Sequence, residues 1–344
     1  DEEIPGEAGV RFDPAAIGSA VGDAVRALAV TADADMQAQS HAVAAAAGLG
    51  LALSGAVSTA TAKPLVDAFV NGGTIVLGQD ATVSATGKTR AQAESLGVNV
   101  SFGAAAGGSV AKADAVSRVN AYLGNNTQLT GRNLTVSATQ ALAGSGANVS
   151  ADATGAAGAL FAGLSATVAH ADHDSRVSST VGDDSRLTLS GTALVKASND
   201  TRQQADGSGF AAGIVAAGFN DARATSNTVT EAALGDNVYI AAPAAVPATL
   251  MTAVSVIADG TDRNRANATS GSGGLISGSA ATATTSSTSR TTATTGSGDD
   301  ARRIAAKLKR TPGRDGFGDT GYVHSPWASD DDKGIMILDN LDTV

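Results

Sequence analysis

The sequence predicts an all-β fold: an elongated β-solenoid (β-helix) built from repeats of about 53–60 residues, with a short helix and an irregular C-terminal tail. Three observations lead to this prediction. Small side chains dominate the composition, a short motif recurs at regular spacing, and apolar and polar residues alternate between glycine-containing turns.

Small side chains supply most of the apolar content of the 344 residues. Hydrophobic residues make up 43% of the chain but aromatic residues only 3%, because Ala and Val carry most of the hydrophobic share. Such side chains bury little area each, so the core that they form is thin. A thin core suits stacked repeats, in which every unit is covered by its neighbours.

The recurring motif is a V-x-A element, and internal repetition of this kind is the signature of repeat architectures. Its copies are Val30-Thr31-Ala32, Val83-Ser84-Ala85, Val136-Ser137-Ala138, Val195-Lys196-Ala197 and, in degenerate form, Val256-Ile257-Ala258. Subtraction of the Val positions gives spacings of 53, 53, 59 and 61 residues. The motif therefore marks successive units of one array.

Two further markers accompany the V-x-A element. One is a glycine four or five residues upstream, at Gly78, Gly131 and Gly191. The other is an apolar residue followed by a turn pair, as in Val70-Asn71-Gly72, Leu123-Gly124-Asn125, Val181-Gly182-Asp183 and Leu234-Gly235-Asp236. Because these turn residues adopt positive φ at low cost, we expect a sharp turn at each marker.

Period-2 alternation between the turns predicts half-buried strands. It is clear in residues 97–102, 134–138 and 193–197. The alternative is an Ala-rich helix, which is strongest for residues 15–47, where glycine is scarce. Frequent Gly, Thr, Ser and Val favour strands over 48–290.

Two turn markers in each repeat suggest that a 53-residue unit divides into two rungs of about 26 residues. Rungs stacked at the spacing of a β-sheet advance roughly 4.8 Å each. Nine or ten rungs then form a rod roughly 45 Å long. Stacking also covers most of the sheet edges, which limits pairing with other chains.

Three regions are expected along the chain. Residues 1–20 form an N-terminal segment, 21–290 the repeat array, and 291–344 a linker with a C-terminal tail or cap. The Thr-rich run 282–295 fits either a degenerate final rung or a flexible linker. Within the tail, residues 301–310 predict a short basic helix capped by Asp299-Asp300, and 335–338 form an apolar run.

Charge and composition exclude several classes of function. The formal net charge of −10 argues against nucleic-acid binding and against an anionic-membrane binder. No apolar run approaches 18 residues, so neither a membrane span nor membrane insertion is expected. Cysteine is absent, which excludes disulfides and thiolate metal sites. The chain starts at Asp1 without a signal-peptide pattern, which we interpret as a processed form or a fragment.

The repeat resembles the leukotoxin-like filamentous adhesins, which are large secreted bacterial proteins related to filamentous haemagglutinin. The residues that carry the resemblance are the entry 155–160, the strand through Ser175-Arg176-Val177, the turn Gly182-Asp183 and the exit 194–197. It covers roughly residues 20–290. The resemblance implies a right-handed β-solenoid, export through a partner outer-membrane transporter, and an adhesive role. Residues 299–344 lie outside it.

One polar cluster, His170-Ala171-Asp172-His173-Asp174, invites a metal-site interpretation. On a strand, His170, Asp172 and Asp174 share one face and His173 points to the other. A histidine with two carboxylates can hold a divalent metal. We favour a solvated outer face, and predict no metal site, no cofactor and no catalytic residue.

Acidic clusters and enzyme motifs lead to the same expectation. The pairs Asp183-Asp184 and Asp299-Asp300 and the run Asp330-Asp331-Asp332 lack the fixed ligand spacing of a calcium loop. A polysaccharide-degrading solenoid needs paired carboxylates and aromatic platforms, and 3% aromatic content leaves few of these. No nucleophile elbow or phosphate-cradling loop occurs. We therefore expect no enzymatic activity.

The predicted function is a structural and adhesive repeat region of a large secreted bacterial surface protein, acting as a stalk or filament in attachment and located at the cell surface. Expected partners are a host-cell or matrix surface or a polysaccharide, and end-to-end self-association is possible because isolated solenoids expose sticky ends. The alternative is a solenoid face that binds polysaccharide or ice, suggested by the Thr run 282–295. A carbohydrate-active β-helix enzyme is a third option.

Overall fold

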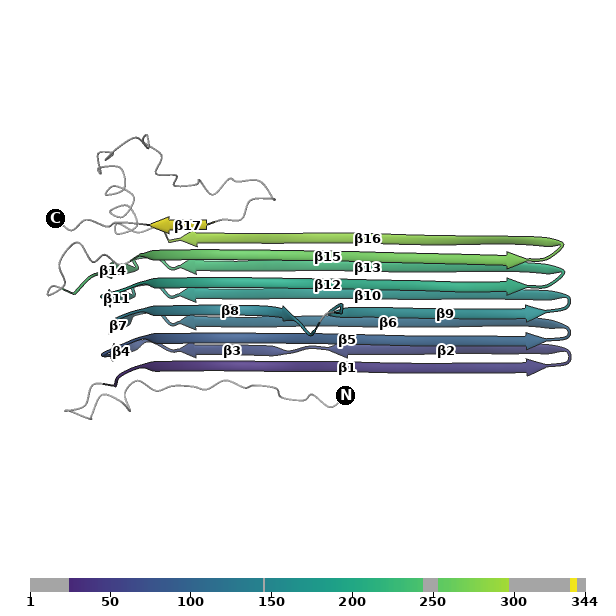
Figure 1. Cartoon of the computed structure of the whole chain (residues 1–344), viewed down its shortest axis with the longest axis horizontal. Coiled ribbons are helices and arrows are strands. Elements are labelled where there is room, and N and C mark those ends of the chain that lie inside the picture. The colour runs from purple at the N-terminus through teal and green to yellow at the C-terminus, as the bar shows by residue number, and fades with distance from the viewer. Residues whose placement is uncertain (1–24, 145, 244–252, 297–334, 339–344) are drawn as a thin grey trace, which may run out of the picture.

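The computed structural model describes residues 25–144, 146–243, 253–296 and 335–338, and every regular element in them is a β-strand (Figure 1). The strands are β1 (Leu28–Gly48), β2 (Leu51–Ala62), β3 (Leu65–Val70), β4 (Gly73–Val76), β5 (Ala81–Ser101), β6 (Ala104–Leu123), β7 (Thr127–Gly131), β8 (Leu134–Leu142), β9 (Val149–Ala159), β10 (Ala162–Val181), β11 (Arg186–Leu189), β12 (Ala193–Ala212), β13 (Val215–Leu234), β14 (Tyr239–Ala241), β15 (Val254–Gly273), β16 (Ile276–Thr295) and β17 (Ile335–Leu338). The predicted all-β class is confirmed for these residues.

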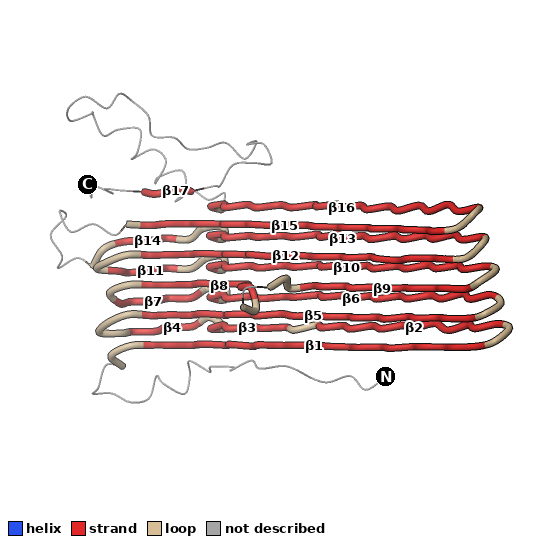
Figure 2. Tube along the Cα trace, turned by 45° about the vertical axis from the view of Figure 1, so that its right-hand side comes forward, coloured by secondary structure: helices blue, strands red, loops and turns tan. Residues whose placement is uncertain are grey.

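Each rung contains two long strands joined by a two-residue turn, and all but the fifth rung add a short strand that leads to the next rung (Figure 2). We call the end with the two-residue turns the tip and the end with the short strands the base. Strand order is β1-β5-β8-β12-β15-β17 in the first sheet, with β9 beside β5 and β12, and β16-β13-β10-β6-β2 in the second, with β3 beside β6. The short strands β4, β7, β11 and β14 form a third sheet. Pairing between rungs is parallel, as in a β-solenoid, and β17 pairs antiparallel with Val254–Ile257 of β15.

The V-x-A copies pair directly with one another on neighbouring strands of the first sheet. Val30 pairs with Val83, Val83 with Val136, Val136 with Val195 and Val195 with Val256. The longer third spacing has its added residues between β8 and β9, and the longer fourth spacing has them between β14 and β15, where residues 244–252 lie outside the described part. The strand register is the same on both sides of these insertions.

The expected division into two rungs per repeat is wrong. Residues on neighbouring rungs are 53 positions apart where Leu28 pairs with Ala81, so a whole repeat supplies one rung. Most of the long strands run for about 20 residues without a break, and only the pairs β2/β3 and β8/β9 are interrupted. The turn at the tip carries no Asn-Gly or Asp-Gly pair, so the sequence contains no sign of where the long strands meet. The five rungs therefore advance only about 19 Å, whereas a 20-residue strand spans roughly 66 Å, so the long axis follows the strands (Figure 1).

The helical alternative for residues 15–47 fails where the structure describes them. Strand β1 covers Leu28–Gly48, and residues 15–24 lie outside the described part. Alternate alanines of β1 face the second sheet across a narrow interior, so tertiary packing overrides the helical preference of Ala. The Thr-rich run belongs to β16, which is the second long strand of the last rung, so this run is not a linker. The predicted helix 301–310 also lies outside the described residues.

The interior changes character along the rung. Near the base it holds Val and Leu side chains in register, as in the column Val70, Leu123, Val181 and Leu234. Farther along, the core consists almost entirely of alanine, with Val149 as the exception. Since alanine fills little space, the two long sheets lie close together there.

The predicted turn markers end the second long strand of each rung. Val70, Leu123, Val181 and Leu234 are the last residues of β3, β6, β10 and β13. Positive φ values follow at Gly72 (86°), Asn126 (58°), Asp184 (56°) and Asn237 (56°). Gly, Asn and Asp tolerate this conformation better than other residues, which explains why the markers recur.

Candidate functional site

The histidine–aspartate cluster is arranged as alternation predicts. His170, Asp172 and Asp174 face outward from β10, and His173 is 3% exposed on the inner face. His170 Nε2 lies 3.0 Å from Asp221 Oδ2 on β13, and the Thr225 hydroxyl donates to Asp172. Within the described ranges no three His, Asp or Glu side chains are grouped as metal ligands.

His173 lies inside a polar band between the two long sheets. Its Nε2 is 3.2 Å from the Ser117 hydroxyl and its Nδ1 is 2.8 Å from the side-chain amide of Gln203. Burial lowers the pKa of His173 to about 4, and the carboxylate of Asp262 acts in the opposite direction. The imidazole is therefore neutral at pH 7 and serves as an interior hydrogen-bonding group.

The Asp183-Asp184 pair belongs to a turn ladder at the base. Asp183 Oδ1 accepts a hydrogen bond from the backbone N–H of Asp236 at 2.8 Å, and Asp184 Oδ1 accepts one from Asn237 Nδ2 at 3.0 Å. Both carboxylates thus connect one rung to the next. Asp299-Asp300 and Asp330-Asp331-Asp332 lie outside the described residues.

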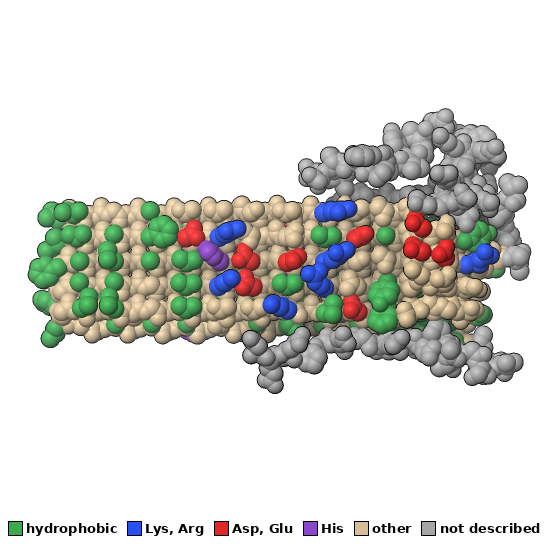
Figure 3. Space-filling model, turned by 180° about the vertical axis from the view of Figure 1, so that it is seen from behind, with side chains coloured by type: hydrophobic (Ala, Val, Ile, Leu, Met, Phe, Trp, Pro, Cys, Tyr) green, Lys and Arg blue, Asp and Glu red, His purple; other side chains and the backbone are tan. Residues whose placement is uncertain are grey.

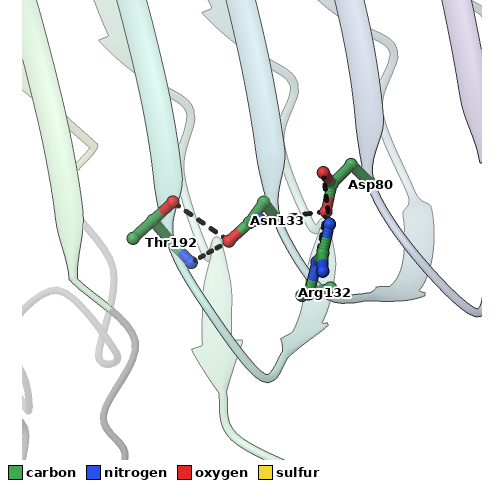
Figure 4. Close-up of polar contacts among 4 residues, drawn as sticks. All are labelled: Asp80, Arg132, Asn133 and Thr192. Atoms are coloured by element: carbon green, nitrogen blue, oxygen red, sulfur yellow. Dashed lines mark hydrogen bonds and ion pairs between the residues drawn. The ribbon is translucent and has the colours of Figure 1, made fainter.

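A second base ladder spans three rungs (Figure 4). Asp80 Oδ1 accepts from Arg132 Nε and from Asn133 Nδ2, each at 2.9 Å, while Asn133 Oδ1 accepts from the Thr192 N–H at 2.8 Å. The hydrogen bond from Arg132 lowers the pKa of Asp80 below its usual value. Both turn ladders fix the rungs in register, which is a structural role.

The tip is the strongest candidate for a functional surface. It comprises residues 42–58, 95–111, 153–169, 207–220 and 266–282, one segment from each rung. None of these segments contains Lys, Arg, Asp, Glu or His. The composition of the whole chain concealed this region, because the charges are concentrated elsewhere.

Large apolar side chains are exposed on both faces and along the turns of the tip. Those at the turns are Leu49 (87% exposed), Phe102 (68%), Leu160 (51%), Phe161 (59%), Ile214 (44%) and Leu275 (86%). Leu53, Leu164 and Phe219 add to the outer face of the second sheet. Figure 3 shows hydrophobic side chains gathered at this end, with charged ones farther along the face. Contiguous exposed apolar surface of this kind marks a contact site.

The interior of the tip is polar where the outside is apolar. Asn99, Ser109, Thr167 and Asn220 are buried between the sheets. The Ser109 hydroxyl donates to Ser95 O at 2.7 Å, and the Thr167 hydroxyl donates to Asn220. Polar side chains thus share the interior of the tip with small alanines, such as Ala52, Ala105 and Ala157, while the large apolar side chains lie outside.

A shallow apolar groove crosses the outer face of the second sheet within the tip. Gly55, Gly108 and Ala166 line it in register on β2, β6 and β10. The larger side chains of Leu53, Leu164 and Phe219 also line it. Its volume is about 680 Å³, and its lining contains no ionisable group.

A row of ionisable side chains borders the tip on the first sheet. His41 pairs with Glu94, Glu94 with Asp152 and Asp152 with Asp206, so the four lie side by side on neighbouring strands. Burial, followed by the charges of Asp206 and Glu94, raises the pKa of Asp152. On the second sheet, Lys112, His170 and Arg223 form the corresponding row.

No protein-family model matches the chain, and no curated protein or solved structure matches it either. The part of the chain that the structure describes contains no helix long and apolar enough to span a membrane.

No functional residue at the tip was predicted from the sequence. The signal was present as five uncharged segments of 14 or more residues, each at the same place in its repeat. The net charge of the whole chain does not show these uncharged segments, because it combines them with the charged segments between them. Aligning the repeats on the V-x-A element reveals them.

Proposed function

We propose that this chain is a structural and adhesive repeat region of a large secreted bacterial surface protein, where it forms part of a stalk or filament. The single observation that carries the proposal is the exposed, uncharged tip on an in-register parallel stack. A stack held together by ladders of hydrogen bonds is stiff, and the tip offers a contact surface along one side of it. The proposed location is the bacterial cell surface.

The finer features of the proposed architecture follow from the connections. Parallel strands joined by a crossover are right-handed in about 98% of cases, so we propose a right-handed coil with one rung per repeat of 53–61 residues. An outer-membrane transporter remains the expected export partner. The acidic net charge of −10 disfavours nucleic acid.

The two ends of the stack differ in their ability to associate. At the first rung, Lys63 and Pro64 interrupt the edge between β2 and β3, and both residue types discourage pairing at a sheet edge. At the last rung, β16 is an uninterrupted 20-residue edge whose side chains are mostly exposed. We propose that self-association, where it occurs, uses the β16 edge.

The alternative functions have less support. An ice-binding face needs Thr ranks that continue from rung to rung, but Thr282 and Thr284 of β16 pair with Asp221 and Arg223 of β13. A carbohydrate-active enzyme needs ionisable groups beside a cleft, and the tip groove has none. A face that binds polysaccharide remains the second candidate, since the charged outer face between tip and base is broad and flat.

An adherence assay tests the proposal. Beads coated with this chain should adhere saturably to cultured cells, to extracellular matrix proteins or to polysaccharide films. Beads coated with an unrelated acidic protein of similar size provide the control. Adherence no greater than the control on every surface would contradict an adhesive role.

A further inference from the structure

We propose that the tip docks on a zwitterionic lipid surface, with its turn side chains in the boundary between headgroups and acyl chains and no strand crossing the bilayer. The proposal rests on the geometry of the tip alone, so it stands whether or not the chain belongs to an adhesin. It departs from the expectation of no membrane insertion, which was based on composition averaged over the chain.

The turns present apolar side chains as a fixed rank. Each of the five rungs contributes at least one large apolar residue at its turn, and neighbouring rungs lie about 4.8 Å apart. The backbone of the turns is also hydrogen-bonded from rung to rung, with Phe102 N donating to Gly48 O at 3.0 Å and Phe161 N to Gly103 O at 3.1 Å. Because the rank is already ordered, docking immobilises little of the chain.

Close approach of the turns requires glycine. A Cβ on Gly103 would lie 2.0 Å from the carbonyl oxygen of Gly50, and one on Gly274 would lie 2.0 Å from that of Gly213. The glycines keep neighbouring turns in contact, and the apolar residue beside each glycine projects outward. The tip is therefore a continuous apolar edge.

The part of the tip nearest the turns carries no charge on any rung. At least six uncharged residues separate every turn from the nearest ionisable side chain of its rung, which corresponds to roughly 20 Å. The turn side chains can therefore enter a lipid interface by roughly 5–10 Å without burying an ionisable group.

The shape and charge of the tip favour lipid over a protein. Exposed apolar side chains lie on both faces of the tip and along its turns. A protein partner would therefore need a deep cavity that encloses the tip from both sides. Lipid surrounds a convex apolar end of any outline. The nearest row on the first sheet is mainly acidic and that on the second sheet is mainly basic, so the favoured surface is zwitterionic and carries both signs of charge.

Unpaired backbone groups limit the depth of docking. The first and last rungs present open strand edges, and such edges are not tolerated in hydrocarbon. Burial of the whole tip is thus disfavoured, while entry of the turn side chains to roughly 5–10 Å keeps most of each edge in water. The geometry points to shallow interfacial binding.

Co-flotation with phosphatidylcholine vesicles tests the proposal on the whole chain. We expect the protein to float with the vesicles, and the double variant Phe102→Ser/Phe161→Ser to partition at least about tenfold more weakly. The matched control is Val76→Ser/Tyr239→Ser, which removes two exposed apolar side chains at the base and should float like the unmodified chain. Failure of the unmodified chain to float, or equal flotation of the tip variant, would overturn the proposal.

A second measurement separates docking from misfolding of the variant. Because the chain contains no Cys, Phe102→Cys and Val76→Cys each provide one site for an environment-sensitive dye. Vesicles should shift the dye emission to the blue at position 102 only. No shift at position 102, or tip-dependent self-association of a chain that ignores vesicles, would overturn the lipid proposal and indicate a protein partner.

Discussion

His173 is the residue whose environment differs most from what its position in the sequence suggests. It belongs to a five-residue run of polar side chains and alanine, yet its ring is enclosed between the sheets beside Ser117 and Gln203. Asp262 faces it from β15 and accepts hydrogen bonds from Thr201 at 2.8 Å and from Ser226. Burial keeps the imidazole neutral.

Stability should fall in acid because of His173. Its pKa of about 4 in the folded chain lies below its ordinary value of 6.5, so the unfolded chain binds the proton first as pH falls. We expect the loss to begin near pH 6.5, to be complete near pH 4, and to reach up to about 3 kcal/mol. Urea denaturation of the unmodified chain and of His173→Gln at pH 7 and pH 4.5 measures it.

The variant should lose much of this pH dependence, although it starts from a lower stability at pH 7. His170→Gln changes an outward-facing histidine of the same strand and should leave the dependence in place. An equal pH dependence in His173→Gln and the unmodified chain would contradict the assignment.

Asn133 joins three rungs through one side chain, donating to Asp80 and accepting from Thr192. Its replacement by alanine leaves the polar groups of both neighbours without their partner. We expect Asn133→Ala to lower the free energy of unfolding by about 1–2 kcal/mol, measured by urea denaturation. Asn120→Ala, which removes one hydrogen bond to Asp67, should cost less. Equal losses would show that bridging adds nothing.

At the scale of the strand, parallel in-register stacking places like residues beside one another. This arrangement favours columns of Val and Ala, but it also aligns the carboxylates of Glu94, Asp152 and Asp206 on neighbouring strands. Like charges in adjacent positions destabilise a sheet. Partial burial, followed by this repulsion, raises the pKa of Asp152.

Asp152→Asn should therefore stabilise the chain at neutral pH by a few tenths of a kcal/mol, up to about 1 kcal/mol. The sign follows from the raised pKa, since ionisation of Asp152 opposes folding as pH rises through and above its ordinary value of 3.8. Thermal unfolding at pH 7 and pH 3 should show a gain at pH 7 only. Asp114→Asn, whose carboxylate lies 3.5 Å from Lys112, should give no gain.

At the scale of the whole molecule, a stack of five rungs is wider than it is tall (Figure 1). Its end strands present open edges except where β17 pairs with Val254–Ile257 of β15. The β16 edge offers an uninterrupted row for pairing, whereas Pro64 interrupts the opposite edge. Growth of a filament from isolated chains depends on whether another chain can add to β16.

Inward-pointing charges at β16 should therefore prevent self-association. Ala283 and Thr285 continue the inner columns of Ala222 and Ala224, so Ala283→Lys/Thr285→Lys places two cations where the next rung would stack. Sedimentation velocity over a range of concentrations should show association of the unmodified chain and none of this variant. Thr282→Lys/Thr284→Lys, on the outer face of the same strand, should still associate. Association of the inward variant would exclude this edge.

The sequence by itself determined the all-β class, the alternation of the strands over 48–290 and the turns at the base. The V-x-A columns and the Asn, Asp and Gly turns encode these features locally, through side-chain alternation and positive φ. The outward direction of His170 and the inward direction of His173 followed from alternation in the same way.

Only the tertiary structure decided that one repeat makes one rung. It also decided that the large apolar side chains of the tip are exposed while Asn, Ser and Thr side chains of the tip are enclosed. The tip turns lack a strong turn signal, so the length of the rung could not be read from them. Alternation separates two faces without stating which is buried, and near the tip Ala, Gly and Ser differ little in hydrophobicity. Packing of the two long sheets against each other decides which face is buried, because it encloses Asn99 and Asn220 and leaves Phe102 and Phe219 exposed.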